Sequence, residues 1–186
     1  VVNKKKDQLS MQDSMKALVI TAPGINCDLE LCEAFALAGC EVESELLTRL
    51  SRDPARIDRY DLIGLPGGFS YGDDIAAGRI MAALIRESIY PALAAAIERG
   101  TPMITPCNGF QIAVQAGLLP GPASGERWSE TATEPTVALA QNESARFNDV
   151  WTTMEIPSGT RCVWTRDLHM DADTALMPCA HGEGRF

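Results

Sequence analysis

Apolar residues in the first two-thirds of the chain come in short runs, separated by segments with helical periodicity. Residues 16–21 form one such run with β-branched side chains, which predicts a buried strand. Residues 40–47 alternate apolar and polar positions, and residues 60–66 and 101–107 are again apolar. Each of these three segments is therefore expected to be a strand.

Helices are expected between these strands. Asn26 or Asp28 can cap a helix that ends at Gly39. Residues 80–99 carry apolar positions at helical spacing, with a proline that marks a break or a helix start. Residues 108–117 follow the fourth strand at once and predict another helix. This alternation predicts an α/β fold, with a mostly parallel central sheet and helices on both faces.

The last third of the chain has a different pattern. Residues 120–135 are rich in Gly, Pro, Ser, Thr and Glu, which is typical of a loop. Strand-like runs follow at residues 136–141, 150–156 and 174–180. The carboxyl ends of strands carry the ligand sites of open α/β sheets, so residues at those ends are the candidates for chemistry.

A length of 186 residues suits one domain with one sizeable core. Residues 1–15 are expected to be disordered or an N-terminal extension. Residues 16–186 are expected to form the domain, which stops directly after a glycine-rich turn and is expected to be truncated at its C-terminus.

The net charge of −9 argues against nucleic acid as a partner, because a polyphosphate would be repelled. No apolar run approaches the roughly 20 residues that span a bilayer, and no signal peptide is visible. We therefore expect no membrane contact and a cytoplasmic location. The six cysteines and two histidines show no zinc-ligand spacing, so no metal site is expected.

Cys107 is the first candidate for chemistry. It lies between an apolar run and a helix, where a tight turn exposes the side chain, as at the nucleophile of α/β hydrolases. The helix N-terminus there favours a thiolate, and the N–H of Asn108 can donate to an oxyanion. A buried structural cysteine at a strand end is the alternative interpretation.

Two more strand ends carry candidates. Gly67 and Gly68 follow the third strand, and an N–H there can complete an oxyanion hole, although a simple turn is the alternative. His181 follows the last strand-like run, with Glu183 two residues on. A general base needs a carboxylate to orient it, and this segment supplies both, although a surface histidine is the alternative. His169, in RDLHMD, is interpreted as a surface histidine in a loop.

In this order the motifs resemble one family, the glutaminase subunits of phosphoribosylformylglycinamidine synthase, which belong to the class I glutamine amidotransferases. The resemblance extends from about Lys16 to the end of the chain. The matching segments are APGINCD (22–28), LPGGFSYGDD (65–74), AAGRI (76–80), CNGFQ (107–111), AGLLPG (116–121), NESARF (142–147) and AHGEGRF (180–186). The combination of GGFSYGD, CNGFQ and AHGEGR distinguishes these subunits from other class I amidotransferases.

The resemblance implies a flavodoxin-like fold and assigns roles to residues. These are Cys107, His181 and Glu183 as catalytic triad, Gly68 and Asn108 as oxyanion-hole donors, and Gly67 and Gln111 as contacts of the bound glutamine. It also implies that ammonia passes to an ATP-dependent synthetase subunit, which makes formylglycinamidine ribonucleotide for purine biosynthesis. No cofactor is implied in this chain; ATP and Mg belong to the synthetase, and a small third subunit is expected.

One position departs from the family pattern. The family has glycine two residues before the nucleophile, where this chain has Thr105 followed by Pro106. Two other functions stay open. One is a domain of the same fold that does not catalyse or uses a different cysteine chemistry, as in the related chaperone and peptidase-like group. The other is a free-standing glutaminase. The His-x-Glu segment favours a glutaminase over the first, and the specific motifs favour a synthetase-coupled subunit over the second.

Overall fold

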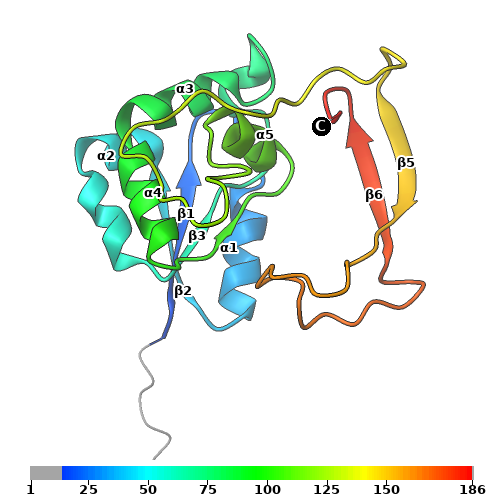
Figure 1. Ribbon diagram of the computed structural model, residues 1–186, viewed down its shortest axis with the longest axis horizontal. Coiled ribbons are helices and arrows are strands. Elements are labelled where there is room, and N and C mark those ends of the chain that lie inside the picture. Colours follow the sequence, from blue (N-terminus) through cyan, green and yellow to red (C-terminus); the bar gives the residue numbers. More distant parts are fainter. Residues whose placement is uncertain (1–13, 186) are drawn as a thin grey trace, which may run out of the picture. The chain divides into compact units, whose positions relative to one another are not determined.

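The computed structural model describes residues 14–185. They belong to two compact units, Val1–Thr136 (unit 1) and Val137–Phe186 (unit 2), and each contains its own sheet (Figure 1). Most of the expected N-terminal extension, residues 1–13, lies outside the described residues.

Unit 1 alternates strands and helices along the chain, as the sequence pattern predicts. Its elements are β1 (Lys16–Thr21), α1 (Asp28–Leu37), β2 (Glu41–Leu46), α2 (Leu47–Arg52), the 3-10 helix η1 (Pro54–Arg59), β3 (Leu62–Gly64), the 3-10 helix η2 (Ser70–Asp73), α3 (Arg79–Ser88), α4 (Tyr90–Glu98), β4 (Met103–Ile104) and α5 (Asn108–Gln115). The four strands form a parallel sheet in the order β2-β1-β3-β4. The predicted α/β class is confirmed.

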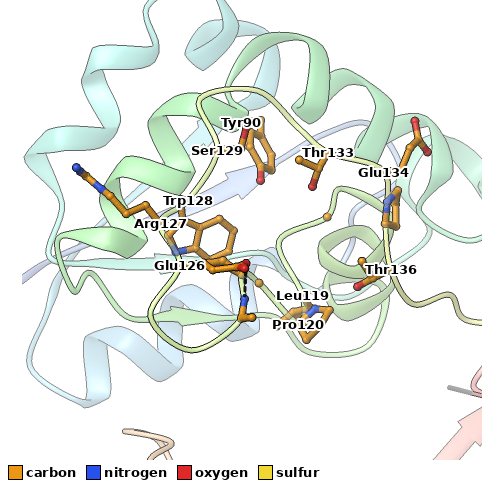
Figure 2. Close-up of a pocket in the computed structure, with 15 residues that line it drawn as sticks. Tyr90, Leu119, Pro120, Glu126, Arg127, Trp128, Ser129, Thr133, Glu134 and Thr136 are labelled. Atoms are coloured by element: carbon orange, nitrogen blue, oxygen red, sulfur yellow. Dashed lines mark hydrogen bonds between the residues drawn. The ribbon is translucent and has the colours of Figure 1, made fainter.

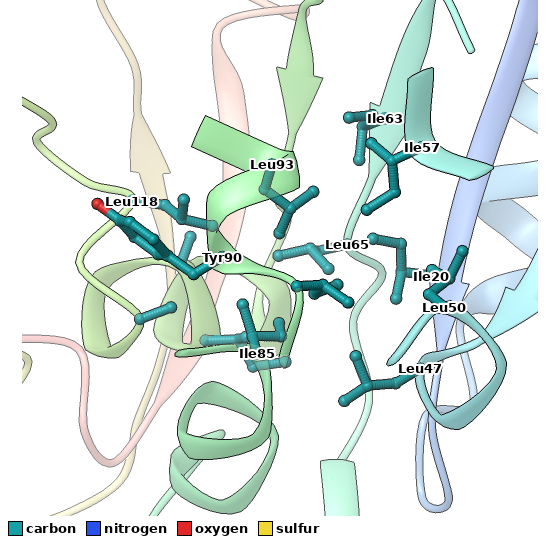
Figure 3. Packing of buried hydrophobic residues seen from close by; sticks show 14 of the residues in the cluster. Ile20, Leu47, Leu50, Ile57, Ile63, Leu65, Ile85, Tyr90, Leu93 and Leu118 are labelled. Atoms are coloured by element: carbon teal, nitrogen blue, oxygen red, sulfur yellow. The ribbon is translucent and has the colours of Figure 1, made fainter. Parts of the chain in front are cut away.

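Helices cover both faces of this sheet. Successive side chains of β1 point to opposite faces, and Leu18 and Ile20 join the main apolar cluster with residues of α2, α3, α4 and α5 (Figure 3). On the other face α1 packs so closely that a methyl group at Gly64 would lie 2.6 Å from Leu31. β1, inside the sheet, is thus buried on both sides, which explains why its residues 17–20 are a continuous apolar run.

The expected break in residues 80–99 is also present. Helix α3 ends at Ser88, and α4 begins at Tyr90 with Pro91 in its first turn, where a missing N–H costs nothing. The two helix axes differ by 79°. Within residues 14–185 no single helix is long and apolar enough to cross a membrane; α3 and α4 pass that test only as this bent pair.

Unit 2 contains an antiparallel pair of strands, β5 (Asn148–Thr153) and β6 (Leu176–His181), which pair from Asn148 with His181 to Thr153 with Leu176. The expected strand at residues 136–141 was wrong: only Ala140 pairs, in an isolated bridge with Arg185. An apolar segment becomes a strand only where a neighbour completes its hydrogen-bond ladder, and among the described residues this segment has a single bridge.

Candidate active site

Cys107 lies at the turn between β4 and α5. Its side chain is exposed, and its backbone has φ 53° and ψ −117°. A positive φ is rare for a residue with a Cβ and marks a strained backbone that the surrounding structure must hold. The chain therefore forms the exposed strand-to-helix turn that the sequence predicts for a nucleophile.

Helix α5 closely approaches Leu65, the residue that follows β3, beside this turn. A methyl group at Gly109 would lie 1.9 Å from the carbonyl oxygen of Leu65, so only glycine fits there. The N–H of Gly109 donates to the carbonyl oxygen of Pro106 at 2.9 Å and closes the turn. The close approach of helix and strand is thus achieved at residue 109, even though Thr105 replaces the glycine of the family pattern.

The loop after β3 lies against Cys107. A methyl carbon at Gly67 would be 3.3 Å from Cys107 Cβ and 3.7 Å from both Cβ and Sγ of Cys27. Gly68 has φ 135°, and a methyl group there would lie 2.6 Å from the backbone N of Asn26. Among residues 14–185 the N–H of Gly68 has no hydrogen-bond partner. It is therefore free to bind a ligand oxygen.

The turn after β1 holds this loop in place. The N–H of Phe69 donates to Gly24 O at 2.9 Å, and the N–H of Tyr71 donates to Pro23 O at 2.7 Å. The N–H of Cys27 donates to Gly67 O at 3.3 Å. This turn has no role among the residues predicted from the sequence. Its position at the carboxyl end of a strand next to the other candidate ends was the available signal.

The Asn108 side chain is the centre of a buried network and is 1% exposed. Its Oδ1 accepts from the N–H of Ser70 at 3.1 Å. Its Nδ2 donates to Asp73 Oδ1 at 3.2 Å and to Gln111 Oε1 at 3.1 Å. The predicted site residues Gly67, Gly68, Cys107, Asn108 and Gln111 all belong to unit 1, and this network connects the last two.

His181 and Glu183 belong to unit 2. His181 is the last residue of β6, and its Nδ1 is buried without a hydrogen-bond partner in the described part of the chain. The side chain of Asn142 donates to the carbonyl oxygens of His181 and Arg146, both at 2.9 Å. The N–H of Asn142 donates to Gly182 O at 3.0 Å. Asn142, which is not among the functional residues predicted from the sequence, therefore holds the histidine turn.

A separate pocket of about 550 Å³ lies in unit 1 beneath the loop before residue 136 (Figure 2). Tyr90, Trp128 and Pro120 contribute apolar walls, and the side chain of Glu126 accepts from the N–H of Ala123 at 3.3 Å. None of the predicted site residues lines this pocket. The candidate active site is therefore assigned to the surface around Cys107 and not to this pocket.

The family model of the CobB/CobQ-like glutamine amidotransferase domain matches residues 14–186. The chain belongs to this amidotransferase family. The predicted relationship to the glutamine amidotransferases is thereby confirmed. The strained turn at Cys107 therefore lies in an amidotransferase domain.

Individual relatives show a more specific similarity within this family. The amidotransferase domain is 37% identical over 173 residues to "Phosphoribosylformylglycinamidine synthase subunit PurQ" of Dehalococcoides mccartyi, with 92% of this chain and 63% of that protein covered. It is 37% identical over 177 residues to the subunit of the same name from Pyrobaculum aerophilum, where 69% of that protein is covered. The chain thus spans about two-thirds of the length of these relatives.

The chain is also similar, in sequence and in fold, to a solved structure. The amidotransferase domain matches a chain in "Structure of PurLQS from Thermotoga maritima" with a TM-score of 0.62 and 34% identity, over 92% of this chain and 68% of that chain. This likeness confirms the class I amidotransferase fold.

Proposed function

We propose that the protein hydrolyses glutamine to glutamate and ammonia and passes the ammonia to an ATP-dependent synthetase subunit, which forms formylglycinamidine ribonucleotide. The observation that carries this proposal is the conformation of Cys107, an exposed cysteine held at positive φ where a strand meets a helix. A strained residue persists only where neighbouring contacts hold it, and such residues gather at active sites. The family description supplies glutamine as the substrate, and the relatives' names supply formylglycinamidine ribonucleotide as the product of the complex.

In the proposed reaction Cys107 Sγ attacks the side-chain carbonyl carbon of glutamine. His181 accepts the thiol proton and then donates it to the departing amine, and Glu183 orients the imidazole. The N–H groups of Gly68 and Asn108 stabilise the oxyanion of the tetrahedral intermediate. Water, activated by the same imidazole, then attacks the thioester and releases glutamate.

Three features of the described residues support these roles. The N–H of Gly68 has no internal acceptor, and the N–H of Asn108 is in the first turn of α5, where helices leave amides unpaired. Both flank Cys107. In unit 2, His181 Nδ1 is buried without a partner, which is the state in which a carboxylate partner would stabilise it.

The proposed partners follow from the likeness to a chain of the PurLQS complex. We propose that this protein likewise assembles with a synthetase subunit, which holds ATP and Mg, and with a small third subunit. Coupling of this kind keeps ammonia from escaping to solvent, because hydrolysis and ammonia use occur in one assembly.

The decisive experiment replaces Cys107 with serine in the full-length protein and measures synthesis in the assembled complex. Cys107→Ser is expected to abolish glutamine-dependent synthesis and to leave synthesis from added ammonia intact, because ammonia bypasses the thioester. Cys162→Ser, at another exposed cysteine, is the matched control and should change neither. Glutamine hydrolysis at the wild-type rate in Cys107→Ser would refute the nucleophile.

The triad has its own test. Residues that act as one unit give non-additive losses, so Cys107→Ser combined with His181→Ala should be little worse than either change alone. His181→Ala is expected to cost more activity than Glu183→Ala, because the imidazole moves protons and the carboxylate only orients it. Fully multiplicative losses would refute the triad.

A further inference from the structure

We propose that Asp73 is a positioning residue for the oxyanion hole and for the glutamine contact. Its carboxylate fixes the orientation of the Asn108 side chain, and through it the loop that carries Gly68. This inference rests on the proposed glutaminase function and assigns a role to a residue that does not itself contact the reacting atoms.

One carboxylate oxygen connects two helix N-termini. Asp73 Oδ1 accepts from the N–H of Gly78 at 3.0 Å, at the start of α3, and from Asn108 Nδ2 at 3.2 Å, at the start of α5. The opposite side of the Asn108 amide accepts from the N–H of Ser70. Ser70 is two residues after Gly68, so both proposed oxyanion donors are attached to this network.

The bonds also fix which way the amide points. An ionised carboxylate only accepts hydrogen bonds, and a backbone N–H only donates. Asn108 must therefore direct its NH₂ group toward Asp73 and its oxygen toward Ser70. The same NH₂ group donates to Gln111 Oε1, so the Gln111 NH₂ group is directed away from Asn108 as a donor. Asp73 and the N–H of Ser70 together thus determine the donor direction of the whole chain of amides.

The loop backbone shows why such an anchor is needed. Tyr71, Gly72 and Asp73 have φ values of 53°, 73° and 52°, three consecutive residues in the left-handed region. Non-glycine residues hold this conformation only where other contacts offset the strain. The two bonds to Asp73 Oδ1 are such contacts, and without them the loop is expected to relax and move Gly68 with it.

The experiment compares Asp73→Ala, Asp73→Asn and the control Asp74→Ala in the full-length protein assembled with its synthetase partner. Asp74 is the exposed neighbour and makes none of these hydrogen bonds in the described structure. Asp73→Ala should lower kcat for glutamine about 10-fold to 100-fold, because small displacements of oxyanion donors are costly. Asp73→Asn keeps an acceptor oxygen and should retain most of kcat, and Asp74→Ala should match the wild type.

A second measurement separates positioning from a general structural role. Alkylation of Cys107 by iodoacetamide forms no oxyanion, so its rate should change little in Asp73→Ala while kcat falls. An unchanged kcat in Asp73→Ala, or an alkylation rate that falls as far as kcat, would overturn the inference. If Asp73→Ala does not fold, Asp73→Asn decides: retained kcat supports the inference, and a loss of kcat overturns it.

The outcomes also distinguish this inference from the proposed function. Wild-type hydrolysis that Cys107→Ser removes, together with an Asp73→Ala variant of normal kcat, rejects the role of Asp73 and leaves the glutaminase standing. A wild-type complex with no glutamine hydrolysis rejects both.

Discussion

Cys27 and Cys107 both contact the space that a side chain at Gly67 would occupy, and both are exposed. From the sequence alone, only Cys107 stands out, because it alone joins an apolar run to a helix. The structure gives the two thiols different surroundings. Desolvation, followed by the charges of Glu30, Cys107 and Asp28, raises the pKa of the Cys27 thiol. Cys27 is therefore a poor nucleophile at neutral pH despite its place beside the candidate active site.

The raised pKa of Cys27 predicts an order of alkylation between this thiol and that of Cys162. In unit 2 a hydrogen bond from Thr165 and backbone N–H groups lower the pKa of the exposed Cys162 thiol. Because the thiolate is the reactive form, iodoacetamide should label Cys162 faster than Cys27 at neutral pH. The difference should shrink as the pH rises above the ordinary thiol range. Peptide mass spectrometry at several pH values measures both rates, and faster labelling of Cys27 at neutral pH would contradict the assignment.

A glutamine-like electrophile should behave differently from iodoacetamide. A diazo-ketone analogue of glutamine is bound before it reacts, so its label is expected on Cys107 and not on the other cysteines. Label on Cys162 with this reagent would show that simple thiolate reactivity, rather than glutamine recognition, decides the site.

Tyr60 and Glu43 form a hydrogen-bonded pair whose contribution to the stability of the fold depends on pH. Tyr60 donates to Glu43 Oε2 at 2.7 Å. This bond lowers the pKa of Glu43, while desolvation and then the bond to Glu43 raise the pKa of Tyr60 to about 12. The stabilisation from Glu43 is present above its unfolded-state pKa and is lost as the pH falls through the acid range. The stabilisation from Tyr60 is lost between about 10 and about 12.

Tyr60→Phe removes this bond and should lower the free energy of unfolding by about 0.5–1 kcal/mol at neutral pH, a small value because Glu43 is exposed. The difference between variant and wild type should shrink in acid, where Glu43 is protonated, and above pH 10, where the unfolded tyrosine ionises. Urea denaturation across this pH range measures it. A difference that stays constant with pH would show that packing, and not the hydrogen bond, is responsible.

At the scale of elements, the contact of α5 with Leu65, just after β3, sets the position of the turn at Cys107. Gly109→Ala tests this contact, because two effects predict opposite signs. Helix propensity alone predicts that alanine stabilises α5 by about 1 kcal/mol. The methyl group would lie 1.9 Å from Leu65 O, and the clash should instead destabilise the protein by about 3 kcal/mol. A raised melting temperature in Gly109→Ala would show that α5 is free to move away from Leu65.

Elements with a complete local pattern could be predicted from the sequence. The strand at residues 16–21 is confirmed residue for residue as β1, and the break at Pro91 is where α4 begins. β4 is shorter than expected, Met103–Ile104 only, because Thr105 and Pro106 already enter the turn. The prediction at residues 136–141 was wrong because a strand depends on a partner that local pattern does not reveal.

The candidate site likewise contains features that a local sequence pattern predicts and features that depend on distant residues. The exposed turn at Cys107 could be predicted because a strand-to-helix turn has a local signature. Asp73 could not, since an acidic residue in a loop is usually solvated, and its bond to Asn108 joins positions 35 residues apart. Asn142 could not be predicted for the same reason: its side chain holds the backbone at His181, 39 residues away. Long-range polar contacts have no periodic pattern in a sequence.

At the scale of the whole molecule, the proposed catalytic residues are divided between units 1 and 2. Of the described residues of unit 2, only Ala175 and Asn142 are buried, and Trp151 on β5 is 68% exposed. A unit that buries so little apolar surface gains little stability by itself. The proposed triad requires a defined arrangement of the two units, so conditions that fix that arrangement should also control activity.

The proposed synthetase partner is the expected source of this control. Uncoupled hydrolysis would waste glutamine, so we expect the subunit alone to be nearly inactive. The loop that carries Gly68 offers a contact to a partner, because Phe69 is 63% exposed and Ile75 is 69% exposed on either side of the strained residues Tyr71 to Asp73. Docking of a partner loaded with its own substrate and nucleotide can press this loop into the conformation in which the Gly68 N–H meets the oxyanion.

One misplaced oxyanion donor costs roughly 10²–10³ in turnover, which is enough for a switch. Steady-state hydrolysis of glutamine by the full-length subunit should therefore rise by about 10² when the loaded synthetase is added. Phe69→Ala should weaken the stimulation, whereas Leu37→Ala, at an exposed apolar residue of α1 outside this loop, should not. Equal activity with and without the partner would reject this gating and leave the triad standing, because the nucleophile and base would then be competent without any help from the loop.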